Sequence, residues 1–334
     1  MGASALGLDR PPRLAVITNP DSGRNRRHLP EVRRVLRRHA AVPHVEARDP
    51  GEVAAGIAQL TDPAPDVLVV NGGDGTVQAV LTALLGNPSL ARLPTLALVR
   101  GGTTNMTAGD VGLREAPLRA LDRLLTLGET LGVQGRVARR PVLRVEVGAG
   151  APARLGMFFG TGAIVTGIRY CHREVHSRGL RDDLAPGICM LRVLWAMVRG
   201  DRTFVSPSPM TVSIRSADEL ALRLPEQEYW LVLASSLERL FLGLRPYWGP
   251  RRGAFFFTAL RGHPVRPLRT LPPLLWGRAG ALATGENGYL SRKVDEIVLE
   301  VDGPVTLDGE VYQASREAGP VRVSTGGWAS FLLV

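Results

Sequence analysis

A glycine-rich segment, Asn-Gly-Gly-Asp-Gly-Thr at residues 71–76, constrains the fold of this chain more than any other feature. It directly follows the apolar run at residues 67–70 and precedes a helix-like segment over residues 77–85. Glycines let the backbone turn sharply and leave its N–H groups unobstructed by Cβ atoms. A helix that begins behind such a turn adds further donors and a dipole that favours an anion. This segment, called the glycine loop below, therefore predicts a phosphate-binding turn between a strand and a helix.

The one carboxylate of the glycine loop, Asp74, points to a metal ion. A carboxylate repels phosphate, so a divalent cation between Asp74 and the phosphate groups explains the pattern. Lys293 is the only lysine of the chain, so the glycine loop has no lysine to bind phosphate. Backbone amides, arginine or a metal have to bind it instead. The alternative reading is an ordinary glycine-rich turn that Asp74 caps.

Two further polar loops follow predicted strands at residues 14–18 and 95–99. They are Asn-Pro-Asp-Ser-Gly at residues 19–23, the first loop, and Gly-Gly-Thr-Thr-Asn at residues 101–105, the third loop. Hydrophobic periodicity predicts the remaining elements of this part: helices at 30–40 and 52–60, and a strand at 42–47. Alternating strands and helices predict an α/β fold with a parallel doubly wound sheet, whose ligands bind at the carboxyl ends of the strands. All three loops lie at such ends.

The pattern changes from about residue 133, after which strands predominate. We predict strands at residues 142–147, 156–159, 211–214, 229–234, 253–258, 296–301 and 321–323, and one helix at 188–198. The sequence therefore predicts an α/β domain over residues 1–130 and a β-rich, sandwich-like domain over residues 131–334, with C-terminal residues free to return to the first domain. The proline-rich segment 263–280 is expected to be a surface loop.

Composition limits the classes of partner. Two cysteines in 334 residues do not form a disulfide framework, and scattered histidines without a Cys-x-x-Cys pair argue against zinc. The net charge of +10 suits an anionic membrane or nucleic acid, but 5% aromatic residues argue against nucleic acid. The apolar stretch at residues 187–198 is shorter than the ~20 residues that span a bilayer. We expect a cytoplasmic protein that contacts membranes peripherally and binds no nucleic acid.

The glycine loop, followed by Gly102-Thr103-Thr104-Asn105 and, near the end, by Asp308-Gly309-Glu310, resembles the diacylglycerol kinase-like lipid kinases. That superfamily includes sphingosine and ceramide kinases and, more distantly, the NAD kinases. The first loop resembles the same family's first loop, and the resemblance extends from Leu14 to the carboxyl terminus. It implies a nucleotide-binding α/β domain, a β-sandwich-like domain and transfer of the ATP γ-phosphate to the hydroxyl of a diacylglycerol-like lipid.

The resemblance also implies the residue roles and the cofactors, ATP and Mg²⁺. Asp74 would hold Mg²⁺, Glu310 would accept the proton of the lipid hydroxyl, and Asp308 would complete the catalytic set. The implied nucleotide-binding residues are Asn19, Ser22, Gly23, Arg48, Asn71, Gly72, Gly73, Gly75, Thr76, Gly102, Thr103 and Asn105. A lipid substrate is the implied partner, and a homodimer is a further expectation. Without the two upstream loops, Asp308-Gly309-Glu310 would be interpreted as a hairpin turn.

Several positions depart from the family pattern. Met106 stands where the family usually has an aspartate, and Gln78-Ala79 stands where it commonly has Asn-Glu. Arg251-Arg252 replaces an acidic pair that holds a structural magnesium in bacterial members, so we expect no such metal. A threonine that contacts the nucleotide in many members aligns near Ala47 or Arg48, and Arg48 could instead pair with a phosphate.

Two other functions stay open. An NAD kinase would share the glycine loop, but the chain lacks the Thr-Pro-Thr-Gly-Ser-Thr segment of that family. A nucleotide- or lipid-binding regulator without turnover is supported by Met106 and Ala79, whereas the retention of both Asp74 and Glu310 argues against it. Three apolar segments flanked by arginine are candidates for membrane contact: Phe241-Leu242, Tyr247-Trp248 and Leu274-Leu275-Trp276.

Overall fold

The computed structural model describes residues 4–5, 10–62, 64–88, 90, 92–130, 135–171, 192, 195–196, 199, 201, 206–216 and 219–333. The chain forms two compact units: unit 1 consists of residues 1–140 and 327–334, and unit 2 of residues 141–326. The division falls inside two long strands, β6 (Arg136–Val147) and β16 (Val321–Leu333), which therefore contribute to both units.

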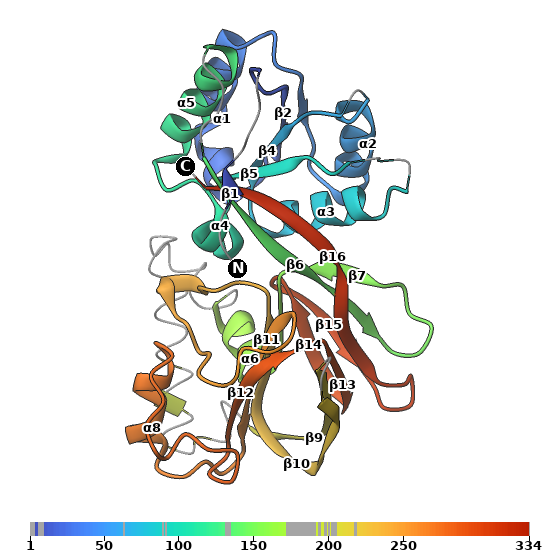
Figure 1. Ribbon diagram of the computed structural model, residues 1–334, viewed down its shortest axis with the longest axis vertical. Coiled ribbons are helices and arrows are strands. Elements are labelled where there is room, and N and C mark those ends of the chain that lie inside the picture. Colours follow the sequence, from blue (N-terminus) through green and yellow to red (C-terminus); the bar gives the residue numbers. More distant parts are fainter. Residues whose placement is uncertain are drawn as a thin grey trace. The chain divides into compact units, whose positions relative to one another are not determined.

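Unit 1 contains a parallel sheet in the order β3-β2-β4-β5-β16 (Figure 1). Its strands are β2 (Leu14–Thr18), β3 (His44–Glu46), β4 (Val67–Gly72) and β5 (Thr95–Arg100), with the short β1 (Ser4–Ala5) paired to β6. From β2 the chain first moves outward to β3 and then returns past β2 to β4 and β5. The winding direction therefore reverses between β2 and β4, and such a switch point leaves a crevice at the carboxyl ends of the two strands.

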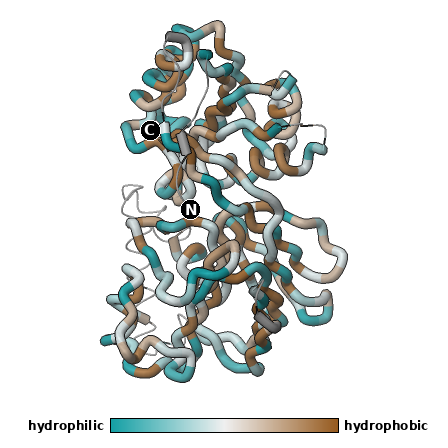
Figure 2. The backbone as a smooth tube through the Cα atoms, viewed as in Figure 1, coloured by the Kyte–Doolittle hydropathy of each residue, from teal (hydrophilic) through white to brown (hydrophobic). Residues whose placement is uncertain are grey.

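Helices cover both faces of this sheet. They are α1 (Gly23–Arg38), α2 (Pro50–Leu60), α3 (Asp74–Leu85), α4 (Met106–Val111) and α5 (Pro117–Thr130). In Figure 1, α1 and α5 lie on one face of the sheet, and α2 and α3 lie on the other. Strands β2 and β4 are buried along their whole length, as expected for central parallel strands, whereas the outer helices alternate hydrophobic and hydrophilic residues (Figure 2). The predicted parallel doubly wound unit is confirmed.

Helix α1 begins earlier than the hydrophobic periodicity predicts. It starts at Gly23, directly after the first loop, and continues through Pro30 to Arg38. Proline has no N–H to donate and clashes with the preceding turn, and the backbone leaves helical geometry at His28. The prediction of a start at residue 30 was wrong because a basic, non-periodic first turn carries no amphipathic signal.

Unit 2 is β-rich, as predicted. Its strands are β7 (Arg154–Gly156), β8 (Phe158–Gly162), β9 (Ser208–Ser216), β10 (Glu219–Ser235), β11 (Phe255–Arg261), β12 (Tyr289–Val294), β13 (Glu296–Val301), β14 (Gly303–Leu307) and β15 (Glu310–Ala314). The strands form antiparallel pairs in the order β15-β14-β8-β10-β9-β13-β16, and β11 links β10 to β12. Their inward side chains form one continuous apolar core that includes Phe159, Tyr229 and Phe257.

Unit 2 also contains α6 (Ala163–Tyr170), a 3-10 turn (Phe241–Gly243) and α8 (Pro267–Leu274). Helix α8 corrects the prediction of a surface loop over residues 263–280. Pro267 occupies the first turn, where its missing N–H costs nothing, and the inner face of α8 packs Leu274 against a cluster that includes Tyr289. The predicted helix at 188–198 lies outside the described residues apart from positions 192, 195 and 196, which are helical.

Candidate functional site

The three polar loops of unit 1 meet at the carboxyl ends of β2, β4 and β5. The N–H of Asn19 donates to the carbonyl of Asn71 at 3.0 Å, and the N–H of Gly101 donates to the carbonyl of Gly72 at 3.1 Å. The hydroxyl of Ser22 accepts a hydrogen bond from the N–H of Gly73 at 3.3 Å. The glycine loop is therefore held between the first and third loops, at the switch point of the sheet.

Close packing explains why glycine occupies several of these positions. A Cβ atom on Gly23 would approach the hydroxyl of Thr103 to 2.5 Å, and one on Gly72 would approach that of Thr76 to 2.6 Å. Gly73 and Gly102 face each other, with no room for a side chain on Gly102. Many of the predicted nucleotide-binding glycines thus bring the loops together.

Gly75 is different from the other glycines of the glycine loop. Its φ is not positive, it is exposed, and a Cβ atom there would meet nothing within 4 Å. Packing within unit 1 therefore does not require glycine at this position. Open space above the first turn of α3 is what a bound phosphate needs.

The N-terminus of α3 lacks a side-chain cap, because its N-cap residue is Gly73. The amides of Asp74, Gly75 and Thr76 in its first turn have no intrahelical acceptor, and no group among the described residues accepts a hydrogen bond from them. These donors and the helix dipole favour an anion in front of α3.

The carboxylate of Asp74 holds α4 to the glycine loop. It accepts hydrogen bonds from the backbone N–H groups of Met106 and Thr107, both at 2.9 Å. Burial raises the pKa of Asp74, while the hydrogen bonds from Thr107 and Met106 lower it. The Thr107 side chain donates a further hydrogen bond to this carboxylate. Of the about four lone-pair sites of the half-buried carboxylate, these bonds leave one for another ligand. Met106 takes part through its backbone, so the absence of an acidic side chain there leaves this contact intact.

Two buried polar side chains lie at the carboxyl ends of the neighbouring strands β2 and β4. Thr18 and Asn71 are partners in the sheet register, and both are buried to at least 99%. The hydroxyl of Thr18 and both amide atoms of Asn71 have no hydrogen-bond partner among the described residues. Buried polar groups rarely stay unpaired in proteins, so these atoms at the switch point suit a polar ligand or water.

The remaining predicted residues of unit 1 organise the loops. Asn105 has a left-handed backbone with φ 48°, and its side chain both accepts from the N–H of Gly102 and donates to the carbonyl of Gly102. Asn19 donates to the hydroxyl of Thr76 at 3.1 Å. Arg48 is half-exposed and forms an ion pair with Asp21 of the first loop at 3.6 Å.

Sequence reasoning did not identify Asn25, which is buried at the start of α1. Its side-chain amide donates to the carbonyls of Asn19 and Asn71, both at 2.9 Å. Asn25 thus joins the first loop to the end of β4. The sequence offered one signal for a special role of this residue: Asn25 is a neutral amide among the basic residues 24–28.

In unit 2, Asp308 and Gly309 form the two-residue turn between β14 and β15. Their φ values are 49° and 97°, as a type I′ hairpin turn requires. The carboxylate of Asp308 is buried and accepts hydrogen bonds from the N–H groups of Met157 and Phe158. These bonds hold the turn to the start of β8 and account for an aspartate here without direct contact with a substrate.

Glu310, the first residue of β15, is exposed beside this turn. The hydroxyl of Tyr312 donates to its carboxylate at 2.6 Å. The guanidinium of Arg154 lies 4.5 Å from the centre of the Tyr312 ring. Because residues two apart in a strand point to the same side, Tyr312 supports Glu310 directly.

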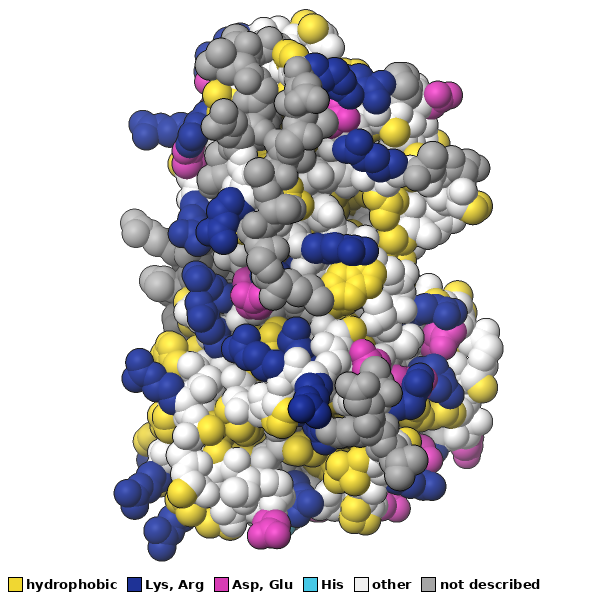
Figure 3. Space-filling view, viewed as in Figure 1, with side chains coloured by type: hydrophobic (Ala, Val, Ile, Leu, Met, Phe, Trp, Pro, Cys, Tyr) yellow, Lys and Arg dark blue, Asp and Glu magenta, His cyan; other side chains and the backbone are white. Residues whose placement is uncertain are grey.

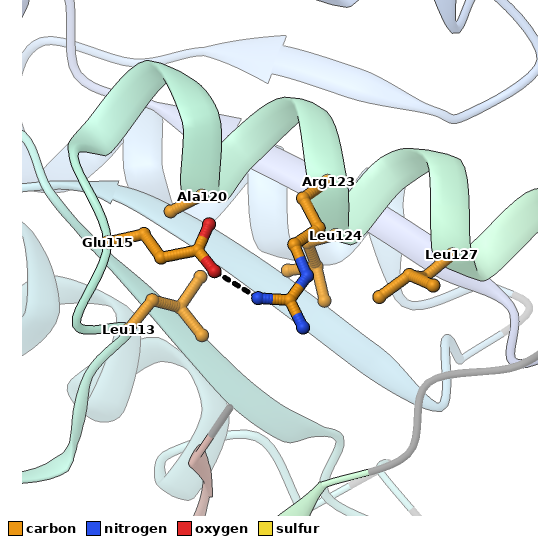
Figure 4. Close-up of a pocket in the computed structure, with 6 residues that line it drawn as sticks. All are labelled: Leu113, Glu115, Ala120, Arg123, Leu124 and Leu127. Atoms are coloured by element: carbon orange, nitrogen blue, oxygen red, sulfur yellow. Dashed lines mark hydrogen bonds and ion pairs between the residues drawn. The ribbon is translucent and has the colours of Figure 1, made fainter.

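A small surface pocket lies elsewhere in unit 1, along α5 (Figure 4). It is lined by Leu113, Glu115, Ala120, Arg123, Leu124 and Leu127. An ion pair between Arg123 and Glu115 crosses it. None of its residues belongs to the three loops, so it is separate from the candidate site.

Among the residues that the structure describes, no three His, Cys, Asp or Glu side chains are grouped to hold a metal ion. Mg²⁺ is commonly bound by one or two carboxylates together with phosphates and water. A single carboxylate such as Asp74 at an uncapped helix N-terminus therefore fits Mg²⁺ that arrives with a nucleotide. In the described part of the chain, no helix has the length and apolar character needed to cross a bilayer.

Residues 13–133 match the family model of the diacylglycerol kinase catalytic domain. Over 71 residues the chain is 39% identical to a protein of Stenotrophomonas maltophilia (strain K279a) called "Probable lipid kinase YegS-like". That match covers 21% of this chain and 23% of the relative, so it spans less than a quarter of the relative's length.

Solved structures resemble the chain over almost its whole length. A putative diacylglycerol kinase from Bacillus anthracis str. Sterne has a TM-score of 0.62 and 18% identity, and 98% of each chain is covered. A diacylglycerol kinase structure from the same organism has a TM-score of 0.57 and 15% identity over 96% of each chain. At these identities the likeness concerns the fold, and it agrees with an α/β unit followed by a β-rich unit.

Proposed function

Because residues 13–133 match the family model of the diacylglycerol kinase catalytic domain, we propose that this protein is an ATP-dependent lipid kinase. The reaction is transfer of the γ-phosphate to the hydroxyl of a lipid of the diacylglycerol type. The protein acts from the cytoplasm, in peripheral contact with the membrane that contains its substrate. The observation that carries the proposal is the convergence of three loops around the uncapped N-terminus of α3, at the switch point of a parallel sheet.

In this proposal the residues of unit 1 bind and orient the nucleotide. The first-turn amides of α3 donate to the phosphates, and the open space over Gly75 lets the phosphate chain approach the backbone. Asp74 would hold Mg²⁺, which when bound neutralises phosphate charge. Ser22, Asn25 and Asn105 keep the loops in position through the hydrogen bonds described above.

In unit 2, Glu310 is the proposed general base. Phosphoryl transfer requires positioning and charge neutralisation more than covalent help from the protein. A carboxylate beside the acceptor oxygen can take its proton as the new P–O bond forms. Tyr312 orients this carboxylate, and Asp308 orients the turn that precedes it.

The proposal is tested with the purified protein, γ-labelled ATP, Mg²⁺ and a mixed lipid extract. Label in a lipid with a free hydroxyl supports the proposal, and the identity of that lipid gives the substrate. A parallel reaction with NAD as acceptor tests the NAD kinase alternative, which label in NADP alone would establish. Nucleotide binding without any labelled product would instead favour the regulator.

Gly75→Ala is expected to weaken ATP binding without loss of stability. The new methyl group meets no atom of the protein within 4 Å, and alanine is preferred over glycine in a helix by about 0.5–1 kcal/mol. It intrudes only where a phosphate is proposed, so we expect the Kd for Mg-ATP to rise roughly tenfold. Calorimetric titration and thermal unfolding measure the two quantities.

Gly109→Ala is the matched control for this variant. Gly109 is also helical and exposed, in α4, and a Cβ atom there likewise meets nothing within 4 Å. Its Kd for Mg-ATP should equal that of the wild type. If Gly75→Ala also binds ATP like the wild type, phosphate does not approach this turn.

Tyr312→Phe is expected to lower kcat while the KM for ATP stays close to the wild-type value. The variant removes the hydroxyl that donates to Glu310 at 2.6 Å and keeps the ring beneath Arg154. Loss of one hydrogen bond to a charged group predicts a roughly tenfold decrease. Steady-state kinetics measure kcat and KM. Gln313→Ala is the control, because Gln313 is an exposed neighbour on the opposite side of β15. Wild-type kcat in Tyr312→Phe would show that Glu310 needs no support.

A further inference from the structure

An acid-free, arginine-rich segment of unit 2 contains much of the exposed apolar surface of the described chain. Residues 239–285 include eight arginines and no aspartate or glutamate, in a chain with 31 acidic residues. Seven large hydrophobic side chains are exposed among the described residues, and four of them lie in this segment: Leu242, Val265, Leu268 and Trp276. Single exposed hydrophobic residues are common, but a group of them within one basic segment needs an explanation.

Helix α8 has apolar residues on both of its faces. Its inner face buries Thr270 and Leu274 against a cluster that includes Tyr289 and Trp230. A surface helix normally carries polar or charged residues on its outer face. On α8 that face instead contains Leu268, Arg269, Pro272 and Pro273, and the helix is followed by Trp276. Leu268 is 68% exposed and Trp276 is 57% exposed.

The 3-10 turn at residues 241–243 adjoins the end of α8. The N–H of Arg245 donates to the carbonyl of Leu275 at 2.8 Å, and Gly277 lies against the carbonyls of Arg245 and Tyr247. The turn exposes 57% of Leu242, which has a φ of 56° in the left-handed region that non-glycine residues rarely adopt. Leu242 and Trp276 therefore belong to neighbouring segments, and both side chains are exposed.

Exposed arginines accompany these apolar side chains. Arg245, Arg266, Arg269 and Arg278 are all exposed, and Figure 3 shows dark blue side chains beside yellow ones at the lower left, where Figure 1 shows α8. The nearest acidic residues along the chain, Glu238 and Glu286, lie outside the segment. This combination of positive charge with leucine and tryptophan is complementary to an anionic lipid surface, where arginine meets headgroups and apolar side chains insert.

We propose that the outer face of α8 and the adjoining turn at residues 241–243 form the membrane-binding surface of this protein, and that the surface selects anionic lipid. The inference deepens the proposed lipid kinase function and rests on it. Of the three candidate segments in the sequence, it selects Leu242 and Trp276. It excludes Tyr247, which is buried and stacks on Phe256 with ring centres 4.1 Å apart.

The test is sedimentation of the intact protein with vesicles, in the absence of ATP. Vesicles of phosphatidylcholine alone are compared with vesicles that contain 30% phosphatidylglycerol, a composition of about one anionic lipid in three. We expect binding to the anionic vesicles that decreases when salt is raised, since the screening length falls to about 3 Å at 1 M salt. Equal binding to both kinds of vesicle, or to neither, would overturn the proposal.

Substitutions then locate the surface. Leu268→Ser and Trp276→Ala are each expected to reduce vesicle binding about fivefold, given the apolar area they remove. Arg269→Glu should reduce vesicle binding about tenfold or more, since loss of one arginine near an anionic surface weakens binding about fivefold and the introduced glutamate adds repulsion. All three side chains are exposed, so folding should be unaffected.

Matched controls separate this surface from general apolar character and general charge. Leu222→Ser removes a leucine that is 44% exposed in β10, and Arg119→Glu reverses an exposed arginine on α5. Both controls should bind vesicles like the wild type. If they lose binding as strongly as the α8 variants, or if Leu268→Ser instead abolishes a dimer seen by light scattering, the membrane assignment is wrong.

Vesicle binding and lipid phosphorylation are independent readouts. Labelling of lipid in detergent micelles, together with absent vesicle binding, would overturn the membrane surface and leave the kinase proposal standing. Binding that depends on Leu268 and Trp276, without labelling of any lipid, would refute the kinase proposal and leave a membrane-binding protein.

Discussion

Asp74→Asn should abolish Mg²⁺-dependent ATP turnover. The substitution removes the negative charge proposed to hold Mg²⁺ and replaces one acceptor oxygen by an NH₂ group. Because both oxygens accept backbone N–H groups, from Met106 and Thr107, one donor will then face another donor. A lost hydrogen bond to a charged group costs about 1.5–3 kcal/mol, so thermal unfolding has to be measured beside turnover.

Thr107→Val separates the two consequences of this substitution. It removes the side-chain hydrogen bond from Thr107 to Asp74 but retains the carboxylate and the backbone amide. We expect Thr107→Val to keep most of its turnover. If it loses as much activity as Asp74→Asn, the attachment of α4 is responsible for the loss and Asp74 is not a metal ligand.

The pKa of Asp74 gives this site a characteristic pH dependence. Burial raises that pKa above the ordinary aspartate value, so Asp74 is protonated at a higher pH than a typical aspartate. As pH is lowered, Mg²⁺-dependent turnover should therefore start to decrease at a higher pH than the range in which an ordinary aspartate becomes protonated. The sign for stability is opposite: Asp74 stabilises the fold below its unfolded pKa, and this contribution is lost as pH rises through the raised folded value.

Glu310→Gln should lower kcat by about 10²–10⁴, the usual contribution of a general base. The KM for ATP should stay close to that of the wild type, because the proposed role of Glu310 concerns the acceptor and not the nucleotide. Glutamine keeps an oxygen that can accept from Tyr312. Glu310 is exposed, so the free energy of unfolding should change by no more than about 0.5 kcal/mol.

Glu317→Gln is the matched control, since Glu317 is an exposed glutamate in the turn that follows β15. It should have wild-type kinetics. Equal losses in kcat and in ATP affinity for Glu310→Gln would assign a binding or structural role to Glu310. A kcat near the wild-type value would remove Glu310 from the reaction altogether.

Local chemistry made much of unit 1 predictable. Strands β2, β4 and β5 are continuous apolar runs that stop at polar, glycine-rich segments, and the carboxyl ends of parallel strands meet at one edge of a sheet. The meeting of the three loops followed from these two facts. The hairpin turn at Asp308 and Gly309 also follows from local sequence, since Asp-Gly readily adopts the positive φ values of a type I′ turn.

The roles of individual polar side chains were not predictable in this way. A carboxylate accepts hydrogen bonds from whichever N–H groups the fold brings to it. Asp74 therefore bonds to Met106 and Thr107, more than thirty residues away, and Asp308 bonds to Met157 and Phe158, about 150 residues away. The role of Asn25 was not predictable for the same reason, because the carbonyl groups that accept its hydrogen bonds lie in two other segments.

The sequence by itself determined the alternation of strands and helices and the residue types at the carboxyl ends of the strands, because these depend on hydrophobic periodicity and turn geometry within short windows. The strand order, whose winding reverses between β2 and β4, was decided by the tertiary structure. Only the tertiary structure decided which acids hold backbone amides and which stay exposed. It also decided that a proline-rich segment forms α8, with Leu268 and Trp276 exposed. Burial and hydrogen-bond partners are properties of surfaces that distant segments make together, and no local pattern encodes them.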